Sequence, residues 1–229
     1  MLRLKLTTAL LLLPALCGAA EVTGYVSLTT DYVRRGVSQS GDDVAAQLGV
    51  DVESDWGGMF GVWGSTIDNM RKAGRQHDVE LNAYIGYGRD ITRNWRLSAF
   101  VVGYSYPGLD TPFDYDYVEY SISANYDDRY WIEYGFSSDY YGTGRDAGNI
   151  EVFGEWPVAG TWSLGAGVGF NNVSDVVGED YGYWQLGATG SFRNASLDVR
   201  YHDTDGTVPF LSTEDTAEAR VVLTLTIPF

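Results

Sequence analysis

Residues 162–170 read Trp-Ser-Leu-Gly-Ala-Gly-Val-Gly-Phe, and this stretch decides the fold. Every second residue is apolar, from Trp162 to Phe170, and the residues between them are serine and glycine. Successive side chains of a β-strand point to opposite faces, so this alternation predicts a strand with one apolar face and one small, polar face. Its length of about ten residues is also what a strand needs to cross a bilayer.

The same alternation recurs along the chain, and no stretch shows a convincing helical period. Twelve strands are predicted, at 22–32, 46–52, 60–66, 79–87, 95–101, 118–126, 130–136, 150–156, 162–170, 184–192, 195–201 and 221–229. The third is the weakest, because Trp63 and Ile67 fall on the opposite parity. The connections alternate between short turns, such as 89–94, 127–129 and 157–161, and longer loops, such as 34–43 and 138–148. That arrangement is typical of an outer-membrane barrel.

A soluble β-sandwich also alternates, so the apolar faces must separate the two folds. They carry no charged residue, as lipid contact requires. Large aromatic residues gather at the strand ends, where amphipathic rings meet lipid headgroups. The short-turn girdle is predicted to contain Tyr87, Trp95, Tyr126, Trp156, Trp162, Phe192 and Phe229. We therefore expect an all-β, transmembrane, antiparallel up-and-down β-barrel of about twelve strands, closed so that no strand edge meets lipid.

The N-terminus and the composition define the setting. Residues 1–20 read as a cleaved signal peptide, with basic Arg3 and Lys5, an apolar centre and the small residues Gly-Ala-Ala at 18–20. The barrel domain is then 21–229, and its expected location is the outer membrane of a Gram-negative bacterium. A net charge of −16 disfavours nucleic acid as a partner. The single cysteine, Cys17, excludes a disulfide framework and a cysteine-based zinc site, and we expect no metal or cofactor.

The predicted inward face carries ten acidic residues and three arginines. A negative lumen favours cationic or neutral solutes over anions. The candidate selectivity residues are Asp51, Glu80, Arg96, Glu119, Glu133, Glu151, Asp198 and Arg200. The alternative is that these charges pair and fill a closed interior. Arg34 and Arg35, at the start of the first loop, either pair with lipid phosphates at the outer surface, fold inward as a constriction, or remain solvated and pair with nearby Asp42, Asp43 and Asp68.

Several stretches carry a family resemblance: 27–40 (Ser-Leu-Thr-Thr-Asp-Tyr-Val-Arg-Arg-Gly-Val-Ser-Gln-Ser), 61–65, 80–88, 103–107, 119–123 and 137–140. The fairly specific part is Arg35-Gly36 followed by Ser38-Gln39. At these residues the sequence resembles the TorF family of proteobacterial outer-membrane proteins, which are classed as porins by analogy. The resemblance implies an outer-membrane barrel acting as a channel, and it implies no substrate and no site residues.

The sequence therefore predicts a porin-like channel for passive passage of small, cationic or neutral solutes. The alternative is a non-conducting barrel with a structural or ligand-binding role, and a lipid-modifying barrel enzyme ranks third. Enzymatic hydrolysis is disfavoured because no distinctive serine motif accompanies His77 or His202, the two histidines. The expected partners are outer-membrane lipids, small solutes, and the barrel-assembly machinery through the C-terminal strand ending in Phe229.

Overall fold

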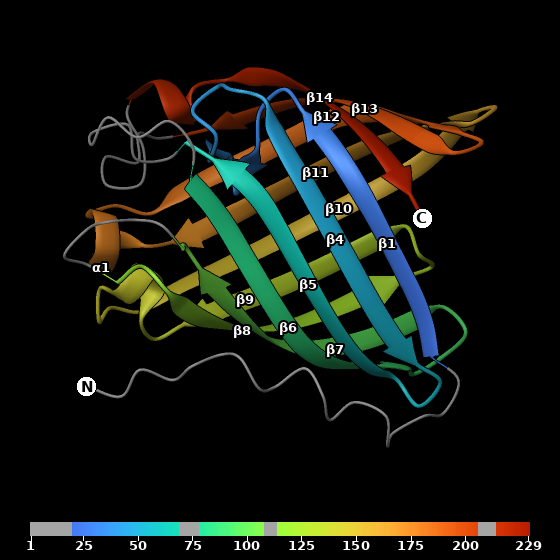
Figure 1. Cartoon of the computed structure of the whole chain (residues 1–229), viewed down its shortest axis with the longest axis horizontal. Coiled ribbons are helices and arrows are strands. Elements are labelled where there is room, and N and C mark those ends of the chain that lie inside the picture. The colour runs from blue at the N-terminus through green and yellow to red at the C-terminus, as the bar shows by residue number, and fades with distance from the viewer. Residues whose placement is uncertain (1–19, 69–77, 108–113, 206–213) are drawn as a thin grey trace.

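The computed structural model describes residues 20–68, 78–107, 114–205 and 214–229, and these residues form a closed antiparallel barrel (Figure 1). The expected signal peptide thus lies almost entirely outside the described residues. The twelve barrel strands are β1 (Ala20–Thr29), β4 (Ala45–Ser54), β5 (Gly58–Ile67), β6 (Asp78–Asp90), β7 (Trp95–Ser105), β8 (Tyr117–Tyr126), β9 (Tyr130–Ser137), β10 (Ala147–Ala159), β11 (Trp162–Asn172), β12 (Tyr181–Phe192), β13 (Ala195–Thr204) and β14 (Arg220–Pro228). The predicted fold class and strand number are confirmed.

Closure joins the first strand to the last. β1 pairs with β14 in a register that sets Leu28 opposite Leu225, and with β4 on its other side. The terminal Phe229 continues this ladder, because its amide donates to the Gly24 carbonyl at 2.8 Å and its carbonyl accepts from the Gly24 amide at 3.1 Å. Every strand of the barrel is therefore hydrogen-bonded to a neighbour on both sides, as a β-barrel in the hydrocarbon core of a membrane requires.

Two of the predicted turns are shorter than expected. β6 extends to Asp90, which pairs with Arg96, and β10 extends to Ala159, which pairs with Trp162. The predicted turns at 89–94 and 157–161 were too long because turn-forming residues there still take part in the ladder. The predicted turn at 127–129 keeps its three residues, because Tyr126 pairs with Tyr130, and Asp127 and Asp128 both have positive φ (60° and 53°).

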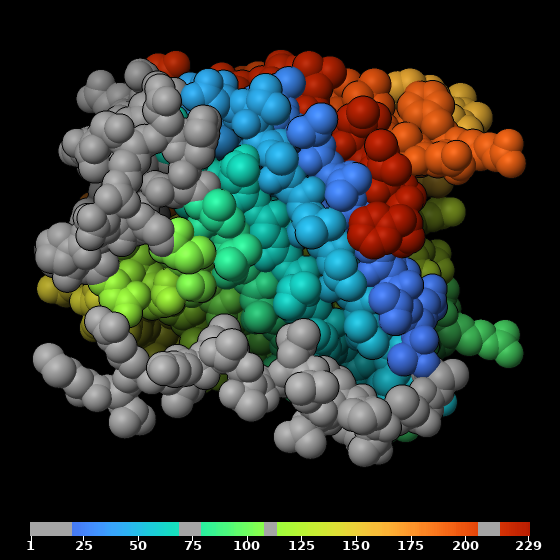
Figure 2. Space-filling model, viewed as in Figure 1, coloured from blue at the N-terminus to red at the C-terminus, as the bar shows by residue number. Residues whose placement is uncertain are grey.

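The outer face of the barrel is apolar and exposed. Side chains of β1, β4, β5 and β6 form one continuous wall, with β14 beside β1 (Figure 2). Mid-strand residues such as Ile122 (62% exposed) and Val168 (61%) point outward. All seven predicted girdle residues are exposed, and several touch one another, as Trp95 and Tyr126 do at 4.8 Å between ring centroids. A surface this apolar is suited to lipid.

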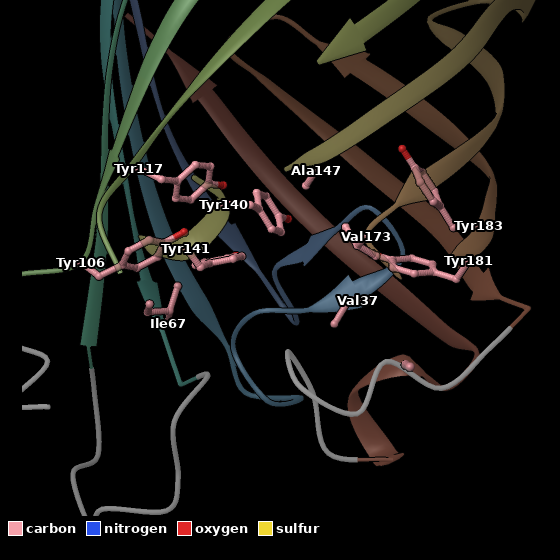
Figure 3. Packing of buried hydrophobic residues seen from close by; sticks show 11 residues of the cluster. Val37, Ile67, Tyr106, Tyr117, Tyr140, Tyr141, Ala147, Val173, Tyr181 and Tyr183 are labelled. Atoms are coloured by element: carbon pink, nitrogen blue, oxygen red, sulfur yellow. The ribbon is translucent and has the colours of Figure 1, made fainter. Parts of the chain in front are cut away.

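The long-loop end contains short elements that fold over the lumen: a hairpin of β2 (Val33–Arg34) and β3 (Val37–Ser38), η2 (Tyr140–Gly142), α1 (Ser174–Val177) and η3 (Glu214–Ala217). No helix in the described parts of the chain is long and apolar enough to span a membrane. These elements enclose an apolar core inside the barrel mouth (Figure 3). Its buried members are Val37, Ile67, Tyr106, Tyr117, Tyr140, Tyr141, Ala147, Val173, Tyr181, Tyr183 and Ala217.

This inner core explains the irregular parity of the third predicted strand. Ile67 points inward and belongs to the core, with 4% of its surface exposed. Trp63 also points inward, and its ring meets Tyr32 edge-on at 5.3 Å. The two residues break the alternation because they face an apolar plug and not a hydrated lumen.

Candidate functional site: the lumen and its hairpin

The hairpin of β2 and β3 turns through Arg35 and Gly36. Both residues have positive φ, 49° and 78°, which matches the two-residue type I′ turn of tight hairpins. Glycine is required at position 36 for two reasons. Its positive φ favours glycine, and a Cβ there would lie 2.4 Å from Thr204 Cγ2 and 2.7 Å from Tyr183 Cβ. The turn therefore presses directly against the wall formed by β12 and β13.

The base of the hairpin is tied to the barrel through Asp31. One of its carboxylate oxygens accepts the Ser38 hydroxyl at 2.6 Å and the Ser40 hydroxyl at 2.8 Å. The other accepts Arg220 Nη1 at 2.6 Å, and Arg220 also pairs with Asp42. Asp31 and Arg220 are buried, so these charge-assisted bonds hold the base firmly against β14.

The two arginines of the hairpin reach across the lumen to the opposite wall. Arg35 donates to Glu119 Oε1 at 2.7 Å, and Arg34 lies 3.8 Å from the other carboxylate oxygen. Arg34 also donates to the Tyr117 hydroxyl at 2.7 Å and stacks on the Tyr104 ring at 4.4 Å. Only 14% of the Arg34 side chain and 11% of the Arg35 side chain are exposed. The alternative in which they stay solvated and pair with Asp42, Asp43 and Asp68 is therefore wrong.

A layer of tyrosines covers the arginines on the loop side. The Tyr117 ring lies 5.0 Å from both Tyr140 and Tyr141. The space between the arginines and these rings is about 10 Å³, roughly the room for one water molecule. Burial raises the pKa of the Tyr106 and Tyr141 phenols above the usual value, so both rings stay neutral. The described residues thus close the lumen at its loop end.

Three hollows lead from the short-turn end to the hairpin. The first, about 870 Å³, lies at the turns and shares Glu21 and Glu53 with a second of about 500 Å³. The second shares Tyr104, Glu119 and Glu133 with a third of about 330 Å³, which ends at the arginines. The lumen is therefore a series of adjoining cavities, smaller in volume toward the hairpin, whose walls carry carboxylates and aromatic rings.

Comparison with known proteins identifies the family. A family model described as "Bacterial protein of unknown function (Gcw_chp)" matches residues 16–229. The chain belongs to the Gcw_chp family. No curated protein matches the sequence.

Solved structures that superpose on this chain include two porins and a transporter. The NanC porin superposes with a TM-score of 0.59 at 6% identity, covering 91% of this chain and 99% of that one. The KdgM porin gives 0.55 at 7% identity, with coverage of 91% and 99%. The Pseudomonas putida toluene transporter TodX gives 0.51 at 11% identity, with coverage of 91% and 88%. At these identities the likeness establishes the fold of this Gcw_chp protein.

The structure brings some of the sequence-predicted lumen residues together. Asp51, Glu119 and Glu133 line the 500 Å³ cavity, and Glu151 lines the 330 Å³ cavity beside Glu119 and Glu133. Glu151 accepts the Tyr183 hydroxyl at 2.7 Å. Glu119 and Glu133 are therefore the two carboxylates at the junction of the two cavities.

Other predicted residues lie elsewhere. Arg96 sits at the turn-end hollow and pairs with Glu53 and, at 3.3 Å, with Asp90. Asp198 and Arg200 bond to each other at 2.8 Å and do not line the two inner cavities. Glu80 also lies outside both linings, fully buried, with the Asn82 amide donating to it at 2.8 Å. These charged residues fit the alternative prediction, in which the inward charges pair with one another and fill a closed interior.

Sequence reasoning missed the tyrosine layer. Tyr140 and Tyr141 lie in a loop, where no strand alternation marks them as inward-facing. Their signal was the apolar pair itself, set between the polar residues of a long loop. For the enzyme hypothesis, His202 lines the 330 Å³ cavity and not the lipid face. His77 lies outside the described residues, within which no group of three acidic, histidine or cysteine side chains is placed to hold a metal ion.

Proposed function

We propose that this protein is a porin-like channel of the outer membrane of a Gram-negative bacterium, for small cationic or neutral solutes. The observation that carries the proposal is the series of adjoining cavities, which runs through a closed barrel from the turns to the hairpin. A barrel filled throughout by packed side chains would leave no such path. The shared fold with porins adds support.

The charges along this path support a preference for cations. Asp51 and Glu133 face the 500 Å³ cavity, and neither forms a hydrogen bond or ion pair with another described residue. Glu21 stands nearer the entrance, where Glu53 is paired with Arg96. A low-dielectric channel with unpaired carboxylates concentrates cations and repels anions. In this proposal Arg34 and Arg35 form the constriction, and the paired charges of Glu119 contribute less to selectivity than Asp51 and Glu133.

The remaining expectations belong to the same proposal. The resemblance to the TorF family supports a channel, and residues 1–20 serve as the export signal for a barrel of residues 21–229. The exposed aromatic girdle suits contact with lipid headgroups. The strand ending in Phe229 would be the segment that the barrel-assembly machinery recognises. No catalytic step is included.

The test is planar-bilayer conductance of the refolded mature barrel, with the reversal potential measured across a KCl gradient. We expect discrete steps with cation preference, reduced in the double variant Asp51→Asn/Glu133→Gln. Asp128→Asn removes a charge of the same sign from an exposed turn outside the lumen, and it should leave the reversal potential unchanged. Equal shifts in both variants would refute the lumen assignment.

The second candidate is a non-conducting barrel that binds a ligand. It is favoured by the closed loop end, where only about 10 Å³ separates the arginines from the tyrosines. A folded barrel that gives no steps, even when the closure is removed as described below, would end the channel proposal and favour this candidate.

A further inference from the structure

We propose that the closure at the loop end is a gate, formed by the turns at Arg35 and Tyr141, and that the ion pair between Arg35 and Glu119 is its latch. This inference rests on the proposed channel function and names how that channel is regulated.

The closure has a fixed part, which is the backbone of the hairpin, and a releasable part, which is the arginine side chains. The base is held by the bonds from Ser38, Ser40 and Arg220 to Asp31, and the turn is pressed on Thr204. Across the lumen, the wall strand β8 lies five places from β1 round the ring in one direction (β4, β5, β6, β7, β8) and seven in the other. Side chains alone bridge this gap, so release at β8 requires no movement of the hairpin backbone.

The latch has alternative positions close by. Glu133 and Glu151 line the same 330 Å³ cavity as Arg35 and Glu119. A guanidinium that leaves Glu119 can therefore pair again without being stranded in a low-dielectric site, which would otherwise oppose its release. This exchange of partners gives the arginine two discrete positions.

Two of the five non-glycine residues with positive φ in the described chain lie at this closure. Arg35 (φ 49°) and Tyr141 (φ 51°) are both left-handed, a conformation that costs a residue with a side chain about 1 kcal/mol. Both residues line the 10 Å³ space. Strained residues persist only where surrounding contacts hold them, and they gather at clamps and switches. Arg34 joins the two turns, because its bond to Tyr117 fixes the ring on which Tyr140 and Tyr141 pack.

The experiment compares single-channel records of charge-reversal variants. Arg35→Glu and Glu119→Arg each break the latch, and we expect the open fraction to rise roughly tenfold or more, the range for losing a charged hydrogen bond. The double variant Arg35→Glu/Glu119→Arg restores opposite charges and should return the open fraction toward wild type. Arg129→Glu is the control, because it reverses a charge on an exposed turn outside the lumen. Heat-modifiable gel migration verifies that each barrel folds.

A further variant separates failure of the latch from failure of the channel. Arg34→Ala/Arg35→Gly/Tyr140→Ala/Tyr141→Gly removes the closing side chains and places glycine at both left-handed positions. If this variant conducts but the single reversals behave as wild type, the latch is refuted and the channel stands. If the single reversals raise the open fraction but the double variant does not lower it again, the latch is also refuted. If the four-residue variant folds without conducting, the channel proposal itself fails.

Discussion

Replacing Asp31 by alanine removes the acceptor that fixes the base of the hairpin. The carboxylate accepts three hydrogen bonds of 2.6–2.8 Å, from Ser38, Ser40 and Arg220. The side chains of Asp31 and Arg220 are only 7% and 9% exposed. Removing one partner of a buried ion pair costs about 3–5 kcal/mol, mainly because the other charge is stranded. Arg220 keeps its pairing with Asp42, so we expect the lower end, about 3 kcal/mol.

Two variants calibrate this value. Asp31→Asn keeps an oxygen acceptor of the same shape and should cost less, about 1–2 kcal/mol. Asp90→Ala breaks another aspartate–arginine contact, with Arg96 at 3.3 Å, but Asp90 is 71% exposed. Exposed pairs contribute about 0–1 kcal/mol, so this variant should be close to wild type.

The measurement is urea unfolding of the barrel in lipid vesicles, followed by tryptophan fluorescence. Trp63 is a suitable reporter because its ring contacts Tyr32, the neighbour of Asp31. The order of stability should be wild type and Asp90→Ala, then Asp31→Asn, then Asp31→Ala. If Asp31→Ala loses no more free energy of unfolding than Asp90→Ala, the base of the hairpin is not an anchor and the reasoning fails.

Three further predictions concern the turn, the wall and the tyrosine layer. Gly36→Ala should destabilise the barrel by more than Gly178→Ala in urea unfolding, because both have positive φ but a Cβ at Gly178 meets nothing within 4 Å; equal losses would refute close packing of the turn. Ile122→Lys, on the lipid face, should lower the free energy of unfolding by about 2–4 kcal/mol, and Ser123→Lys, on the neighbouring lumen side, should lower it much less. The reverse order would refute the assignment of faces. Burial raises the pKa of Tyr141, so its stabilising effect is full below the unfolded pKa of about 10 and is lost as the pH rises through the folded value. Alkaline unfolding should therefore occur at higher pH in Tyr141→Phe, and an unchanged midpoint would contradict burial of a neutral phenol.

The strands could be predicted from the sequence because each one separates two different surroundings. A residue such as Leu164 meets lipid while its neighbours Ser163 and Gly165 meet the lumen, and this difference is repeated at every second position. The rule holds wherever the inner surroundings are polar. At Trp63 and Ile67 the inner surroundings are apolar. The alternation is therefore lost there, although the strand still forms.

The closure could not be predicted in the same way. Its contacts join residues far apart in sequence, such as Arg35 with Glu119, and no local period marks such pairs. The positive φ of Arg35 and Gly36 is a hairpin signal that the Arg-Gly pair carries only weakly, since Asn-Gly or Asp-Gly is the usual form. The burial of Glu80 depends in the same way on neighbours supplied by the folded barrel.

The apolar core within the barrel mouth has a consequence for the order of folding. Its members come from segments as distant as Val37 and Ala217, and they meet only when the last strand has joined the first. Contacts of such long sequence separation form late, since the entropy of ring closure is lost before they exist. The core in the barrel mouth should therefore be the last part of the molecule to pack. During folding, a barrel that is already inserted but whose loop end is not yet packed should precede the native protein.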